Sequence, residues 1–304
     1  MKILLGNKYF FIKGGAENAF FATAELIKKK GHQDIPFSMK DKRNFSSSFD
    51  KYFVSNVDYK RNDLGHRISN VLNIFYSLEA KRNIDKLICD TIPDLVHLHN
   101  IYHQISPSIL HVTKKHQLPV VMTLHDYKII CGSYSMFANE QPCEACCGER
   151  YYQCFCKGCV KDSRMKSMIT TVEMYLHHKL LHIYDLVDIF ISPSRFLKEK
   201  VEAMGFKSKI VYLSNFIHVE AFVPCFEFQG RTICYIGRLS KEKYSLVFGS
   251  SFSWDFSFTS WGGSGFHTIQ RVRKLDGQEK SLLWVYSFSH STYHLALPIP
   301  NRLI

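Results

Sequence analysis

The stretch MKILLGNKYFFIKGGAENAFFATAELIKKKG (residues 1–31) decides the fold class of this chain. Lys2–Leu5 is a short apolar run that predicts a strand, and Gly14-Gly15 predicts a loop after it. Ala16–Lys30 predicts a helix, because its apolar residues recur at helical spacing and lysines fill its last turn. A strand, a glycine loop and a helix in this order begin a βαβ unit.

The same alternation continues along the chain and predicts an α/β domain over residues 1–213. Continuous β-branched runs separated by amphipathic helices are typical of a parallel sheet covered on both faces. The polar residues 40–70 predict an insertion or loop. Ser106 is the expected N-cap of its helix, with Pro107 in the first turn. The predicted strands are Asp94–His99, Pro119–Leu124, Val187–Ser192 and Ile210–Leu213, and the predicted helices are Ser106–His116, Ser163–Tyr184 and Ser194–Met204.

Composition and charge limit the classes of partner. The chain has 304 residues, of which 46% are apolar and 22% charged, so it is globular in composition. Its net charge of +12 favours polyanions, namely nucleic acid, an anionic membrane face or phosphorylated small molecules. No apolar run is long enough to predict a membrane span. The N-terminus does not predict an export signal, so we expect the ten cysteines in a reducing compartment.

A second domain begins after a predicted linker at residues 214–230. Residues 231–243 contain a buried strand and a glycine turn followed by two cations, Arg238 and Lys243. This arrangement is suited to binding a diphosphate; the alternative is a solvated pair of cations at a strand end.

The sequence changes character at Tyr244. All three tryptophans follow this point and all ten cysteines precede it. The last 61 residues hold 11 serines and three acidic residues, without the alternation of strands and helices that a second α/β domain needs. We therefore expect residues 244–304 to be an aberrant tail, read out of frame, and the second domain to be only begun.

Four short motifs together resemble glycosyltransferase family 4. They are Gly14-Gly15-Ala16-Glu17, Thr123-Leu124-His125-Asp126, Ile191-Ser192-Pro193-Ser194 and Tyr235-Ile236-Gly237-Arg238-Leu239. The resemblance covers residues 1–243 and is nearest to bacterial enzymes of capsule, cell-wall or polysaccharide biosynthesis. It implies the GT-B fold, in which two Rossmann-like domains face each other. The first domain here would carry a Cys-rich insert at about residues 131–165.

The resemblance also implies an activity. Such enzymes transfer a sugar from a nucleotide-sugar donor, here a UDP- or GDP-sugar, with retention of configuration and without a catalytic metal. The implied acceptor is lipid-linked or a polysaccharide, and the implied location is cytoplasmic, peripheral on the inner membrane face. The family has a glycine where this chain has Tyr244 and a later Glu-x7-Glu motif that is missing here. The alternative is therefore a non-catalytic remnant that binds only an acceptor or an anionic membrane.

The resemblance assigns roles to residues that match its motifs. His125 and Asp126 would be catalytic, with a purely structural histidine as the alternative for His125. The donor diphosphate would be bound by Gly14, Gly15, Arg238 and Lys243, although a simple tight turn also accounts for the glycines. The acceptor-side candidates are Glu17, His99, Asn100 and His103; the alternatives are a helix-dipole acid for Glu17 and ordinary loop residues for the others.

A cysteine cluster predicts a metal site. Cys143-x2-Cys146 and Cys154-x4-Cys159 offer four thiolates, which suit a tetrahedral structural zinc ion. Cys156 can replace Cys154 as a ligand on spacing alone, whereas a related insert in the family favours Cys154. Reduced cysteines, disulfides and an iron–sulfur cluster are the alternatives. A zinc module that binds nucleic acid is disfavoured, because the basic residues are spread over the α/β elements and not concentrated beside the cluster.

Overall fold

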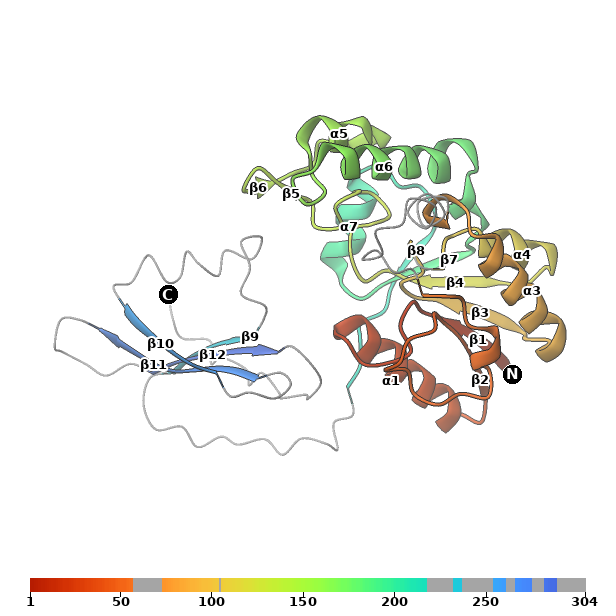
Figure 1. The fold of residues 1–304 in the computed structure, drawn as a ribbon, viewed down its shortest axis with the longest axis horizontal. Helices are drawn as coiled ribbons and strands as arrows, with labels where there is room; N and C mark the ends of the chain where they lie inside the picture. The colour runs from red at the N-terminus through yellow and green to blue at the C-terminus, as the bar shows by residue number, and fades with distance from the viewer. Residues whose placement is uncertain are drawn as a thin grey trace. The chain divides into compact units, whose positions relative to one another are not determined.

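The structure, a computed structural model, describes residues 1–56, 73–103 and 105–217, and the backbone of four strands beyond them (Figure 1). The chain divides into two compact units. The first comprises Met1–Phe11 and Gly15–Phe216, and the second comprises Ile12–Gly14 and Ile217–Ile304.

The first unit is built on a six-stranded parallel sheet with the strand order β2-β1-β3-β4-β7-β8. Leu4 in the centre of β1 pairs with Ile35 of β2 and Val96 of β3, and Met122 of β4 pairs with Leu98 of β3 and Phe190 of β7. The strands are β1 Lys2–Gly6, β2 Gln33–Phe37, β3 Leu95–Leu98, β4 Val120–Thr123, β7 Ile189–Ser192 and β8 Ile210–Tyr212.

Helices connect these strands and cover the sheet. Helices α3 and α4 pack against each other, as do α5 and α6 (Figure 1). The helices are α1 Gly15–Lys29, α3 Leu78–Thr91, α4 Ile109–Lys115, α5 Tyr152–Lys157, α6 Arg164–Tyr175 and α7 Arg195–Ala203, and the short 3₁₀ turns are η1 Asp50–Tyr52, η2 Cys147–Glu149 and η4 Ile183–Leu186.

Strand β1 shows why both faces of the sheet are buried. Successive side chains of a strand point to opposite faces, so Leu4 joins the main core, whereas Ile3 and Leu5 join a second cluster with Phe20 and Ala24 of α1. Ile3, Leu4 and Leu5 are each at most 7% exposed. The predicted α/β class and the parallel sheet covered on both faces are thereby confirmed.

Two helix boundaries differ from the prediction. The helix predicted from Ser106 begins at Ile109 with Ser108 as its N-cap, because Ser106 has a left-handed φ of 74°. The Ser108 hydroxyl donates to the Ser77 carbonyl at 3.1 Å, which ties α4 to the start of α3. The long helix predicted over Ser163–Tyr184 ends at Tyr175 and continues as a π-helical turn, η3 Leu176–Leu180.

Strand β2 and helix α3 were not predicted. Pro36 lies within β2, and a proline weakens a strand prediction except at an edge; β2 is indeed the edge strand of the sheet. Helix α3 begins at the N-cap Ser77, whose side chain accepts from the Ala80 amide. Residues 57–72, which overlap the predicted insertion at 40–70, lie outside the described residues.

The second unit contains a four-stranded sheet with the order β10-β11-β12-β9. Strands β10, β11 and β12 are antiparallel, although no regular element was predicted there, and β12 pairs with β9 in parallel. No helix occurs among the described residues of this unit. The strands are β9 Thr232–Ile236, β10 Trp254–Ser260, β11 Phe266–Lys274 and β12 Leu282–Phe288.

Within the described part of the chain, no helix combines the length and apolar character that crossing a membrane requires.

Candidate functional site

The carboxyl ends of the parallel strands meet at one edge of the sheet, where α/β proteins bind ligands. Lys8 follows β1, His99 follows β3, and His125 with Asp126 follows β4. Strand pairing in register places these segments side by side, so residues distant in sequence form one group.

The centre of this group is a pair of histidines. His99 Nδ1 and His125 Nε2 are 2.9 Å apart and hydrogen-bonded, and the two rings stack with centroids 5.1 Å apart. The ring of His97 lies 4.5 Å from that of His99 and is itself hydrogen-bonded to the Thr123 hydroxyl. His125 is half-buried, whereas His99 is 1% exposed and lies in the interior.

Both histidines of the pair are neutral at pH 7. Burial, together with the charges of His97 and Lys8, lowers the pKa of His125 to about 4. Burial also holds the pKa of His99 well below its usual range. In a neutral pair one ring must donate and the other accept, so the tautomer of His125 is coupled to that of His99.

Asp126 is oriented by its own loop. Its Oδ1 accepts a hydrogen bond of 2.8 Å from the Lys128 amide, and burial raises the pKa of its carboxyl group. The charge of Lys8 acts on both Asp126 and His125 and favours the ionised form of the Asp126 carboxyl group. Lys8 was not predicted as a site residue, although its position shortly after the first predicted strand was an available signal.

A buried charge network lies behind the loop of Asp126. Lys128 Nζ contacts Glu173 Oε2 of α6 at 2.6 Å, and both side chains are at most 1% exposed. Burial by itself raises the pKa of Glu173. The charges of Lys128 and His103 together lower it by more, so the pKa lies well below its usual range. His103 Nε2 contacts the same oxygen at 3.2 Å, so this acceptor-side candidate is held within the network.

The other acceptor-side candidates are buried. Asn100 is 7% exposed. Its backbone N–H donates to Asn7 Oδ1, and its backbone carbonyl accepts from the Lys8 backbone N–H. These bonds join the loops after β1 and β3. Glu17 lies in the first turn of α1 and is 4% exposed.

Only part of the predicted donor site can be located. Gly15 begins α1, and a Cβ added there would meet no atom within 4 Å, so its surroundings are open. Gly14 directly precedes the helix. Arg238, Lys243 and Tyr244 lie outside the described residues.

The predicted zinc ligands line one small hollow. Cys143, Cys146, Cys154 and Cys159 line it, and so does Cys131, which the sequence analysis did not include. Cys156 is exposed and does not line the hollow. The Cys154 thiol is hydrogen-bonded to Cys159, which lowers the pKa of Cys159 to about 7, while burial raises the pKa of Cys146 to about 12.

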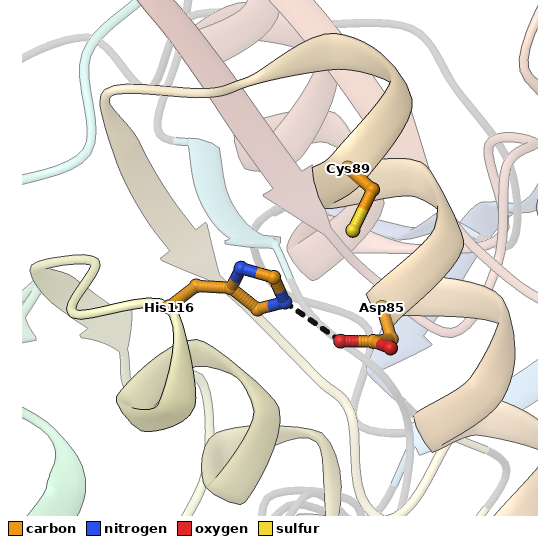
Figure 2. A group of neighbouring side chains, drawn as sticks. All are labelled: Asp85, Cys89 and His116. Atoms are coloured by element: carbon orange, nitrogen blue, oxygen red, sulfur yellow. Dashed lines mark hydrogen bonds and ion pairs between the residues drawn. The ribbon is translucent and has the colours of Figure 1, made fainter.

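A second group of metal-ligand types joins α3 to the end of α4 (Figure 2). The ligand atoms of Asp85, Cys89 and His116 lie within 4.8 Å of one another, and among the described residues the hollow's sulfurs do not form so compact a group. However, Asp85 Oδ1 already accepts from His116 Nε2 at 2.6 Å and from Lys115 Nζ at 3.2 Å. We interpret the group as a set of polar contacts that join the two helices, and we call it the α3–α4 tie.

The fold defines a Rossmann-like α/β protein, with a candidate ligand site at the carboxyl ends of its strands. A family model described as Glycosyltransferase Family 4 matches residues 13–221. The chain therefore belongs to glycosyltransferase family 4, and its first unit has the architecture expected of a GT-B N-terminal domain.

Known proteins similar to the chain are longer than the matched part. A protein from Klebsiella pneumoniae, described as an uncharacterized 42.6 kDa protein in the cps region, is 25% identical over 256 residues. The match covers 79% of this chain and 62% of the relative, so the chain spans about three fifths of that relative's length.

Solved structures show more distant similarity. The lipopolysaccharide outer core galactosyltransferase WaaB is 15% identical, with a TM-score of 0.40 and coverage of 79% of this chain and 53% of WaaB. Sucrose-phosphate synthase from Thermosynechococcus elongatus is 10% identical, with a TM-score of 0.47 and coverage of 78% and 55%. At these TM-scores the likeness carries no argument about substrate.

Proposed function

We propose that this chain derives from a retaining glycosyltransferase that moves a sugar from a nucleotide-sugar donor to a lipid-linked or polysaccharide acceptor. The observation that carries the proposal is the neutral His125, half-buried at the carboxyl end of β4 beside Asp126 and hydrogen-bonded to the buried His99. A neutral imidazole fixed at this edge can hydrogen-bond a sugar hydroxyl without adding charge where the glycosidic bond breaks.

Each residue of the group has a distinct proposed role. His99 binds Nε2 of His125, so Nδ1 of His125 is the nitrogen that faces the donor sugar. Asp126 shapes the loop through its bond to the Lys128 amide and contacts the acceptor. The departing nucleoside diphosphate develops negative charge, which the Gly14-Gly15 amides, Arg238 and Lys243 would stabilise. No metal ion is needed for these roles.

Net charge and a known relative together support the proposed acceptor class. The net charge of +12 suits contact with an anionic lipid surface or with a lipid-linked phosphate. The relative encoded in a Klebsiella cps region supports an acceptor from capsule polysaccharide synthesis. We propose the cytoplasmic face of the inner membrane as the place of action.

Product formation tests the proposal directly. Radiolabelled UDP- and GDP-sugars are incubated with this chain and with bacterial lipid extracts, and His125→Ala serves as the control. Donor-dependent transfer that His125→Ala lowers by about 10²–10⁴-fold supports the proposal. Proton NMR of the new anomeric centre decides between retention and inversion. A version with the second domain restored that transfers no sugar from any donor contradicts the proposal.

A second candidate is a non-catalytic remnant that binds only an acceptor or an anionic membrane. The change in composition at Tyr244 and the antiparallel strands of the second unit favour it. Thermal-shift titration with UDP and GDP separates the candidates, because the remnant gains no stability from a nucleoside diphosphate. The nucleotide sequence after codon 243 tests the origin of the tail, since a second reading frame encoding Glu-x7-Glu would show a frameshift.

A further inference from the structure

Four thiols from three separate segments of the chain converge on the hollow in the Cys-rich insert. Cys131 lies in the loop that follows His125 and Asp126, Cys146 precedes the turn η2, and Cys154 and Cys159 lie in and just after α5. The first three are at most 8% exposed. Three segments of the insert therefore contribute thiols to one site.

Close backbone contact places Cys131 at this hollow. A Cβ added to the neighbouring Gly132 would stand 3.0 Å from Cys154 Sγ and 2.8 Å from Cγ2 of Thr170 on α6. The loop therefore lies directly against α5 and α6, with no room for a side chain. Cys131 Sγ is 3.3 Å from the Ser133 hydroxyl, within the same loop.

The remaining cysteines of the insert are placed differently. Cys143 also lines the hollow but is only half-buried. The Cys147 thiol points to the Ala203 carbonyl at 3.8 Å. Cys156 is exposed. Burial thus selects Cys131, Cys146 and Cys154, and the hydrogen bond between Cys154 and Cys159 adds the fourth thiol.

We propose that Cys131, Cys146, Cys154 and Cys159 bind a structural zinc ion. Four thiolates match the tetrahedral geometry of such sites. The set differs from the one that spacing predicts, because Cys131 takes the place of Cys143. The sulfurs must draw closer together on binding, since they do not form a compact group in this structure. The ion would fasten the insert to the loop that carries Asp126.

Thiol protection in the native chain tests the proposal. The protein is expressed in zinc-supplemented medium, its metal content is measured, and each cysteine is alkylated with iodoacetamide with and without a chelator. We expect about one zinc ion per chain. Alkylation of Cys131, Cys146, Cys154 and Cys159 should be roughly tenfold slower or more until the chelator is added. Cys156 should react at one rate throughout.

Single variants separate the two ligand sets. Cys131→Ser should lose the bound zinc, whereas Cys143→Ser and the matched control Cys156→Ser should retain it. Absence of zinc from the purified chain overturns the proposal. So does a footprint in which Cys143 is protected and Cys131 is not. If Cys131→Ser does not fold, the footprint of the unsubstituted chain decides by itself.

Discussion

At the scale of single residues, the hydrogen bond between His99 and His125 is the feature on which the candidate site depends. We predict that His99→Phe lowers any sugar transfer about tenfold to a hundredfold, because His125 loses the partner that orients its ring. His99→Asn should restore much of the rate, since the asparagine amide can occupy the position of Nδ1. The comparison is made on kcat and KM separately, and the loss should fall mainly on kcat.

Imidazole NMR tests the role of His99 without an activity assay. Nitrogen-15 NMR of the imidazole reports the tautomer of His125, which should be single in the unsubstituted chain and in His99→Asn. His99→Phe should give a mixture of tautomers. An unchanged His125 spectrum in His99→Phe would show that His99 serves packing alone.

The buried pair Lys128–Glu173 carries a second prediction at this scale. Glu173→Gln should lower the free energy of unfolding by about 3–5 kcal/mol, because Lys128 is then left buried without a countercharge. Replacing both residues with apolar ones, Lys128→Met with Glu173→Leu, should cost far less than either single change. Urea denaturation measures both. A double variant as unstable as the sum of the single variants would contradict this account.

At the scale of secondary-structure elements, sequence patterns were sufficient where strands were continuous apolar runs. The runs at β1, β3, β4, β7 and β8 predicted five of the six strands, because buried parallel strands have few polar residues. Local caps were less informative. Ser106 looked like an N-cap, but its backbone is left-handed and α4 begins at Ile109, next to the tertiary bond between Ser108 and Ser77. A pattern within one segment cannot show a bond to another.

The tie between α3 and α4 gives a prediction at the element scale (Figure 2). Asp85→Ala should lower the free energy of unfolding by about 0.5–1 kcal/mol, a small effect because the carboxylate is 37% exposed. Its pKa is lowered chiefly by the hydrogen bond from His116. The stabilisation is therefore present above the ordinary Asp pKa and is lost as the pH falls through the lowered value.

The matched control for this tie is Cys89→Ser, which should leave stability unchanged. Thermal denaturation at low and high salt measures both variants, and the Asp85→Ala effect should shrink at high salt. A metal-dependent loss of stability shared by both variants would show that the group binds an ion and is not simply a tie.

At the scale of the whole molecule, the sequence could predict that the site lies at the carboxyl edge of the sheet. It could not predict how the residues at that edge contact one another. His125 and Asp126 were assigned by a motif, and their position after β4 follows from strand order. The burial of His99 beneath His125, the cation at Lys8 and the contribution of Cys131 to the hollow arise from three-dimensional packing. Each pairs segments separated by tens of residues, which linear spacing does not encode.

The histidines buried in the first unit make its stability depend on pH. Burial is the main cause that lowers the pKa of each, to about 4 for His97 and His125 and to about 3 for His178, with lowered values also for His99 and His177. Below the ordinary pKa of about 6.5 the unfolded chain binds more protons than the folded chain, so acid favours unfolding. Each histidine should contribute up to about 1.4 kcal/mol per pH unit between pH 6.5 and its lowered value.

Urea denaturation at pH 8, 7, 6 and 5.5 measures this dependence. The histidines should make the free energy of unfolding fall steeply below pH 6.5. Between pH 8 and 7 the lowered pKa of Cys159 should add a separate fall, because the unfolded thiol takes up its proton first. His178→Phe is the matched variant, because Nε2 of His178 is buried with no hydrogen-bond partner among the described residues and its ring packs on Tyr151 and Tyr184. This variant lacks one proton-binding group. Below pH 6.5 its free energy of unfolding should therefore depend less steeply on pH, by up to about 1.4 kcal/mol per pH unit. Equal stability of the unsubstituted chain at pH 7 and 5.5 would mean that these rings are hydrated and not sealed in the core.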